Sequence, residues 1–134
     1  MNFSFITIAG KIGNVDVGFG HLNRSIVIAK ELIKRGHDAS FLYSGDRNAG
    51  LILEENNLEF NQIDFENLES NPNKLQALNR KSKIFFIDLS HPLFLKESKQ
   101  IDSVISILKE ENNRFILIDS PEEQSILKKL QKEQ

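Results

Sequence analysis

The chain contains no cysteine, and this absence excludes three kinds of chemistry. It can form no disulfide, bind no metal through a thiolate and use no thiol as a nucleophile. Its three histidines show no His-x-x-x-His spacing, so we expect no metal centre. A serine in a Gly-x-Ser-x-Gly turn is absent, and so is the phosphate loop Gly-x-x-x-x-Gly-Lys-Ser/Thr. General-base catalysis by a histidine is the enzymatic mechanism that remains open.

An excess of charge of one sign is absent too. The chain has 17 Lys and Arg residues scattered among 19 Asp and Glu residues, which gives a formal net charge of −2. Because the basic residues form no patch, we expect no binding to nucleic acid. No apolar run is long enough to cross a membrane, and no basic stretch followed by an apolar one opens the chain, so we expect no membrane span and a cytoplasmic location.

Proline and glycine are scarce, at three and seven residues, and they are dispersed along the chain. No linker, repeat or low-complexity tract interrupts the sequence, which predicts a single Rossmann-like domain over residues 1–134. A hydrophobic fraction of 40% suffices for a core that needs no covalent cross-links.

Apolar runs and helical periodicity alternate along the chain. The run 3–8 is apolar and rich in β-forming residues, which predicts a buried first strand. The alternation predicts an α/β fold, namely a Rossmann-like three-layer sandwich with a mainly parallel sheet of about five strands. Further strands are expected at 39–43, 58–63, 84–88 and 115–119, and helices from residue 21, at 49–56, at 72–79, around 101–108 and at 120–134.

The first predicted helix carries an apolar stripe at helical spacing, formed by Leu22, Ile26, Ala29 and Ile33. This stripe would pack on the sheet. We therefore expect Arg24 and Ser25 to point away from the packed face or toward its open end.

The segment Val17-Gly18-Phe19-Gly20-His21-Leu22-Asn23-Arg24-Ser25 places two ionisable side chains where a glycine-rich loop becomes this helix. The glycines let the backbone turn sharply, and the free N–H groups of the first helical turn favour an anionic or oxygen-rich ligand. His21 can carry a proton near neutral pH, and Arg24, one turn further on, can hold a carboxylate or phosphate. The segment predicts a site for a polar substrate. The alternative is a tight strand-to-helix turn without a ligand.

Ligands of open parallel sheets bind at the carboxyl ends of the strands, near the point where the strand order reverses. If the order of the five strands is 3-2-1-4-5, His21, Asp88 and His91 converge on one crevice. The second strand ends near Ser44-Gly45-Asp46. Each residue also has a structural interpretation: Asp88 and Asp119 could cap the helices that follow, and His91 could simply precede Pro92. We interpret His37, in a turn at the other edge, as structural.

Residues 17–30, together with Arg35-Gly36-His37 and Phe41-Leu42, resemble the N-terminal segment of the UDP-sugar hydrolase of pseudaminic acid biosynthesis, a member of the glycosyltransferase-B superfamily. The runs Phe85-Phe86-Ile87-Asp88 and Ile116-Leu117-Ile118-Asp119 resemble that family's strands ending in aspartate. In these hydrolases the histidine of the Gly-x-Gly-His motif activates water. The resemblance therefore implies that His21 is the catalytic base, and it implies the N-terminal half of a glycosyltransferase-B fold.

The resemblance also implies a function. The chain would be the water- or acceptor-activating domain of an enzyme that hydrolyses a UDP-deoxyamino sugar and releases UDP, or of a related glycosyltransferase. No cofactor is implied, and the expected ligand is a nucleotide sugar or a sugar. We find no second, nucleotide-binding domain of the family's kind in these 134 residues, so a second domain or subunit is the expected partner. The implied substrate-binding residues are Gly18, Phe19, Gly20, Asn23, Arg24, Asp88 and His91.

Some positions depart from the family pattern. The family continues its fourth strand with Asp-His-Tyr, whereas this chain has Asp88-Leu89-Ser90. The fifth strand ends in Asp119-Ser120 in place of two acids. Two alternatives therefore stay open: a non-catalytic domain that binds a sugar or a partner, and one subunit of a split glycosyltransferase.

Overall fold

The first apolar run of the sequence forms the central strand of a parallel sheet. The computed structural model describes residues 1–12, 14–64, 73, 84–89, 106–108 and 113–118. Strand β1 (Asn2–Ala9) lies between β4 (Asp38–Gly45) and β6 (Ile84–Asp88) and is parallel to both, so that Phe5 lies opposite both Phe41 and Phe86. β1 is therefore an interior strand of the sheet.

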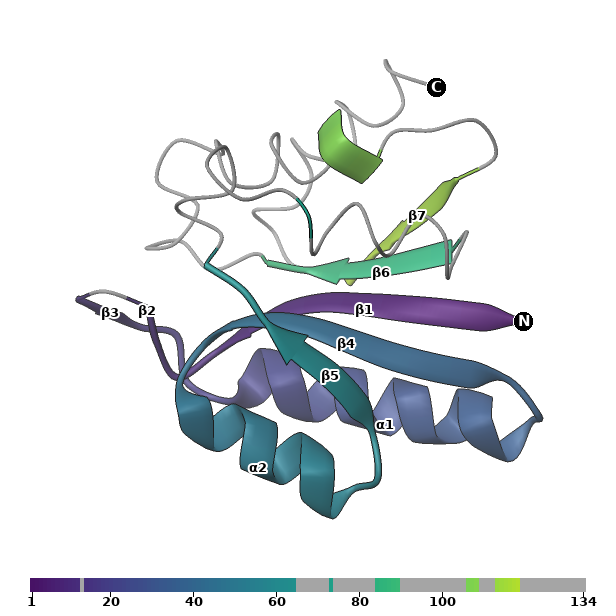
Figure 1. Cartoon of the computed structure of the whole chain (residues 1–134), viewed down its shortest axis with the longest axis horizontal. Coiled ribbons are helices and arrows are strands. Elements are labelled where there is room, and N and C mark those ends of the chain that lie inside the picture. Colours follow the sequence, from purple (N-terminus) through teal and green to yellow (C-terminus); the bar gives the residue numbers. More distant parts are fainter. Residues whose placement is uncertain (13, 65–72, 74–83, 90–105, 109–112, 119–134) are drawn as a thin grey trace.

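Two shorter strands complete the sheet at its edges. They are β5 (Glu59–Gln62), which pairs with β4, and β7 (Arg114–Leu117), which pairs with β6. All pairs are parallel, and the order is β5-β4-β1-β6-β7 (Figure 1). This is the order 3-2-1-4-5 on which the convergence of site residues depended.

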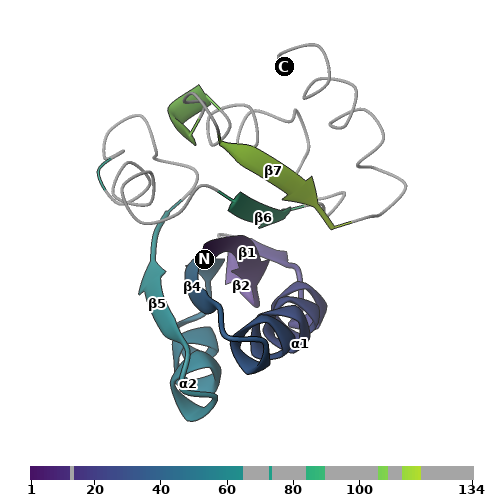
Figure 2. The same ribbon diagram turned by 90° about the vertical axis from the view of Figure 1, so that its right-hand side faces the viewer.

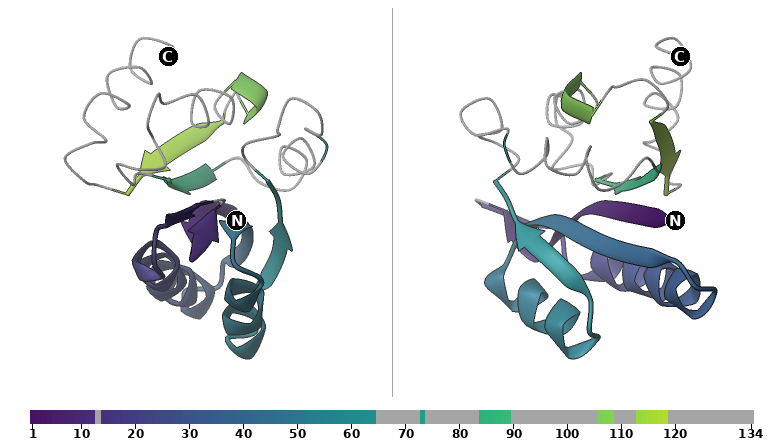
Figure 3. Two further views of the ribbon diagram at one scale, coloured as in Figure 1. Left: turned by 90° about the vertical axis from the view of Figure 1, so that its left-hand side faces the viewer. Right: turned by 45° about the vertical axis from the view of Figure 1, so that its right-hand side comes forward.

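Helices cover the sheet from two sides. Helices α1 (Gly20–Lys34) and α2 (Arg47–Glu55) lie on the same face, as the views in Figures 1, 2 and 3 agree. Residues 106–108 are helical, and Leu108 is buried in the core of the opposite face. The prediction of a Rossmann-like α/β fold with a parallel five-stranded sheet is confirmed.

The alternation of side chains along the strands builds two cores. On the face of α1 and α2, the ring of Phe5 stacks between Phe41 at 4.9 Å and Phe86 at 4.7 Å, measured between ring centroids. On the other face, Ile6 and Ile8 of β1 pack with the apolar residues of β4 and β6. β1 buries side chains on both faces, and five of its eight residues are apolar.

A small hairpin that the sequence did not predict follows β1. Strands β2 (Lys11–Ile12) and β3 (Val15–Asp16) are antiparallel. The neck of the hairpin is closed by hydrogen bonds from the Gly10 N–H to the Gly18 carbonyl (2.7 Å) and from the Val17 N–H to the Gly10 carbonyl (2.8 Å). Gly10 and Gly18 both have positive φ, which a glycine adopts without steric cost. The hairpin thus ends two residues before α1 begins.

Two expectations for α1 were wrong. Ser25 is 1% exposed and lies in the interior, because the helix face that meets the sheet is wider than the apolar stripe. Ile33, assigned to that stripe, is 42% exposed, since it lies near the end of the helix where the sheet no longer covers it.

Most predicted elements appear with shifted ends, while β6 matches its expected range. The predicted helices at 72–79 and 120–134 lie outside the described residues, as does most of the helix around 101–108. Among the helices that are described, none has the length and apolar character needed to span a membrane.

Candidate functional site

Three side chains meet at the carboxyl edge of the sheet, where β1 and β6 lie side by side. Asp88 is the last residue of β6 and pairs in register with Thr7 of β1. His21 and Arg24 are one turn apart in the first turns of α1. Both side chains contact Asp88: His21 Nδ1 lies 2.7 Å from Asp88 Oδ1, and Arg24 Nε lies 2.6 Å from Asp88 Oδ2.

The carboxylate of Asp88 is buried, with 1% of its side chain exposed. Arg24 donates two hydrogen bonds to it, from Nε to Oδ2 and from Nη2 to Oδ1, the second at 2.5 Å. This bidentate geometry matches the two planar groups and gives a strong, charge-assisted pair. The Arg24 side chain is 39% exposed, so the pair runs from the interior to the surface.

The bond to Asp88 determines which nitrogen of His21 carries a hydrogen. An ionised carboxylate can only accept, so Nδ1 donates to Oδ1. In the neutral ring the lone pair then belongs to Nε2. Arg24 Nη2 lies 3.3 Å from Nδ1 because both donors converge on the same oxygen. Asp88 therefore orients a ring whose other nitrogen can accept a proton.

The predicted loop residues lie directly before this cluster. The Gly18 N–H donates to Asp16 Oδ1 at 2.9 Å, and Gly20 is the first residue of α1. Phe19 is the N-cap residue and makes no side-chain cap bond, and the first turn of α1 contains no acidic residue. The positive end of the helix dipole is thus not offset by a carboxylate of its own first turn.

Of the remaining predicted site residues, Asn23 is exposed on α1. Asp88 was predicted to bind substrate. Its buried carboxylate instead contacts His21 and Arg24 and orients those two side chains. His91 and Asp119 lie outside the described residues. His37, interpreted as structural, makes an edge-on ring contact with Phe3 at 5.3 Å near the amino ends of the strands.

Sequence reasoning missed the polar residues that line the interior beside Asp88. Thr7 Oγ1 and Ser25 Oγ are both buried, and neither has a hydrogen-bond partner within the described part of the chain. Thr7 lies next to Asp88 in the sheet, and Ser25 follows Arg24 on α1. The available signal for Thr7 was a polar residue between two isoleucines in a strand expected to be buried.

Tyr43 and Asp46, near the end of β4, extend the polar region on the other side of β1. Burial raises the pKa of the Tyr43 phenol, a hydrogen bond to the Gly50 backbone lowers it, and the negative charge of Asp46 raises it further. The sequence predicted a strand end near Asp46 and indicated no role for this residue.

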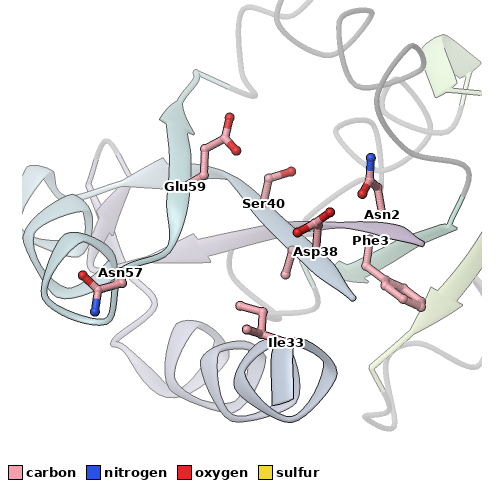
Figure 4. A pocket seen from close by; sticks show the side chains of 8 residues that line it. Asn2, Phe3, Ile33, Asp38, Ser40, Asn57 and Glu59 are labelled. Carbon is pink, nitrogen blue, oxygen red and sulfur yellow. The ribbon is translucent and has the colours of Figure 1, made fainter. Parts of the chain in front are cut away.

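A hollow of about 430 Å³ lies at the opposite edge, at the amino ends of the strands (Figure 4). Its lining includes Asn2, Phe3, Ile33, Asp38, Ser40 and Glu59. None of the residues around His21 belongs to it.

Comparisons with known proteins identify no family for this chain. No family model matches the chain, and no curated protein matches it. In the part of the chain that the structure describes, no group of three or more His, Cys, Asp or Glu residues could hold a metal ion.

Proposed function

We propose that this chain is the water- or acceptor-activating domain of an enzyme that acts on a UDP-linked deoxyamino sugar, with His21 as the general base. The observation that carries the proposal is the His21–Asp88 hydrogen bond at the carboxyl edge of the sheet. The proposal includes a cytoplasmic location, no cofactor, and a second domain or subunit that holds the nucleotide.

The proposed reaction begins when His21 Nε2 takes a proton from water or from an acceptor hydroxyl. The resulting oxygen nucleophile attacks the anomeric carbon or the β-phosphorus. Attack on the anomeric carbon by water or an acceptor breaks the carbon–oxygen bond, and UDP leaves with the bridging oxygen. Attack of water on the β-phosphorus breaks the phosphorus–oxygen bond instead, so that UDP forms at the attacked phosphorus and the sugar leaves with the bridging oxygen, which takes the proton from His21. Asp88 holds the ring through Nδ1 and faces the positive charge that forms on it.

The negative charge that develops on the diphosphate needs positive partners. The uncapped N-terminus of α1 supplies N–H groups and the positive end of a helix dipole. Arg24 adds a positive charge beside the base, although two of its donors are already bound to Asp88. Its contribution in this proposal is chiefly to hold Asp88 in place.

The test has a binding part and a chemical part. In the binding part, the amides of residues 18–25 in the labelled chain are followed by NMR during titration with UDP and with UDP-N-acetylglucosamine. Shifts that need the sugar support a ligand-facing site, and no shift at millimolar ligand contradicts it.

In the chemical part, UDP release is measured for the wild-type chain, His21→Ala and the control His37→Ala, each in the presence of the second domain or subunit that holds the nucleotide. A general base contributes roughly 10²–10⁴-fold to a rate, so we expect His21→Ala to lose about that factor while His37→Ala does not. Analysis of the products with and without added acceptors separates hydrolysis from transfer.

A non-catalytic binding module is the second candidate. It is favoured by the way in which His21, Arg24 and Asp88 satisfy one another, since such a cluster can also serve folding. In that case His21→Ala lowers the free energy of unfolding, and the wild-type chain binds its ligand without releasing UDP.

A further inference from the structure

We propose that Asp46 forms a second subsite, which binds hydroxyl or amino groups of the sugar next to the His21 site. This inference rests on the proposed function. Asp46 directly follows β4, and its N–H donates to the Ala9 carbonyl at 2.8 Å. It therefore lies at the same carboxyl edge as Asp88, with the central strand β1 between them.

The Asp46 carboxylate lies close to the backbone of Gly10, just after the end of β1. Gly10 has a φ of +71°, and a Cβ built on it would lie 2.3 Å from Asp46 Oδ2. The carboxylate thus rests directly against the Gly10 backbone, in a space that any other residue would fill with its own side chain. The position of Asp46 depends on this glycine.

The Asp46 carboxylate lies at the start of a helix but does not cap it. It is the N-cap residue of α2, yet its side chain makes no cap hydrogen bond. It is half-buried, and the described residues place no donor within hydrogen-bonding distance of it. A carboxylate that accepts no hydrogen bond from the described residues, at the edge of the sheet where ligands bind, is available to a ligand that donates.

The chemistry of a carboxylate selects the ligand group and its orientation. Asp46 can only accept hydrogen bonds when it is ionised, so it fits hydroxyl, amino or amide N–H groups and repels phosphate. The N-terminus of α1, in contrast, favours the phosphate. A nucleotide sugar would therefore place its sugar ring toward Asp46 and its diphosphate toward α1.

The experiment compares two probes and three forms of the full chain. Dissociation constants for UDP-N-acetylglucosamine and for UDP are measured by NMR for wild type, Asp46→Asn and the control Asp38→Asn, which changes an exposed aspartate at the opposite end of the same strand. We expect Asp46→Asn to weaken binding of the sugar nucleotide roughly tenfold without weakening binding of UDP, since one charge-assisted hydrogen bond is lost. Asp38→Asn should change neither constant.

The sugar should also shift the amides of Gly10, Gly45 and Asp46 in the wild type, beyond the shifts that UDP causes. Equal effects of Asp46→Asn on both probes, or no effect on either, overturn the Asp46 subsite while leaving the response of residues 18–25 as support for the proposed function. Silence of residues 18–25 toward both probes overturns the proposed function itself, and the Asp46 subsite with it. If Asp46→Asn fails to fold, Asp46→Ser repeats the test, because serine is also favoured at helix N-caps.

Discussion

Asp88 is a buried carboxylate that depends on two neighbouring side chains for its charge partners. His21 and Arg24 together supply all three of its hydrogen bonds shorter than 3 Å that the structure describes. Asparagine keeps one acceptor oxygen, but it removes the charge that pairs with Arg24 and sets an NH2 donor against a donor of His21 or Arg24. We expect Asp88→Asn to lower the free energy of unfolding by about 2–4 kcal/mol, measured by urea denaturation.

Arg24→Gln is the matched variant for this cluster. Because Arg24 is 39% exposed and Asp88 keeps its bond to His21, we expect a smaller loss of about 1–2 kcal/mol. If Asp88→Asn is as stable as the wild type, the described contacts do not stabilise the fold. If the order of the two variants is reversed, Arg24 has a larger role in stability than its exposure indicates.

The ionisation of Tyr43 makes the free energy of unfolding depend on pH. Burial raises the pKa of its phenol above the ordinary value of about 10. Tyr43 therefore stays protonated in the folded chain at pH values where the unfolded chain has ionised. Its contribution is present below the unfolded pKa and is lost as the pH rises through the folded pKa, so we expect the free energy of unfolding to fall at alkaline pH.

The measurement is direct because the chain contains one tyrosine and no tryptophan. Tyrosinate absorbance then reports Tyr43 alone, in the folded chain and in urea. We expect a higher midpoint in the folded chain and a weaker alkaline loss of stability in Tyr43→Phe. Identical midpoints in the two states would show that burial does not act on this phenol.

At the scale of single residues, the sequence predicted the meeting of His21 with Asp88 and missed the partner of Arg24. The first was accessible because strand ends and the start of a helix share one edge of a parallel sheet. The contact between Arg24 and Asp88 depends on how the first turns of α1 lie over β6. The helical periodicity of the sequence carries no information about that placement. Ser25 was misplaced for the same reason.

At the scale of elements, β4 passes close to the backbone of β1 at the carboxyl ends of the two strands. Gly45 has a φ of +135°, and a Cβ built on it would lie 1.8 Å from the carbonyl oxygen of Ala9. We expect Gly45→Ala to cost more than about 3 kcal/mol, because the backbone would be strained and the paired strands would have to separate. Thermal and urea unfolding measure the loss.

Gly20 supplies the control. It is the first residue of α1, its φ is not positive, and no atom lies within 4 Å of the Cβ that would be added. Since alanine favours helix over glycine, we expect Gly20→Ala to be as stable as the wild type or more stable by up to about 1 kcal/mol. Similar losses in the two variants would contradict the close approach of β4 to Ala9.

The predicted bounds of elements differ from the observed ones for a physical reason. The strand expected at 39–43 extends as β4 from Asp38 to Gly45, because ladder hydrogen bonds use the backbone and do not require apolar side chains. The β2–β3 hairpin was missed, since strands of two residues are too short to show a period. The alternation of strands and helices predicted the parallel sheet but left the order of its strands as an assumption, and the structure has the assumed order.

At the scale of the whole molecule, the described strands differ in how well they are protected. β1 has a neighbouring strand on each side and buries residues in both cores, whereas β5 pairs only with β4 and three of its four residues are exposed. We expect the amides of β1 to exchange with solvent only on global unfolding, and those of β5 at least about tenfold faster through local opening. Hydrogen exchange followed by NMR measures both. Equal protection in β5 would mean that this edge strand opens only when the whole sheet unfolds.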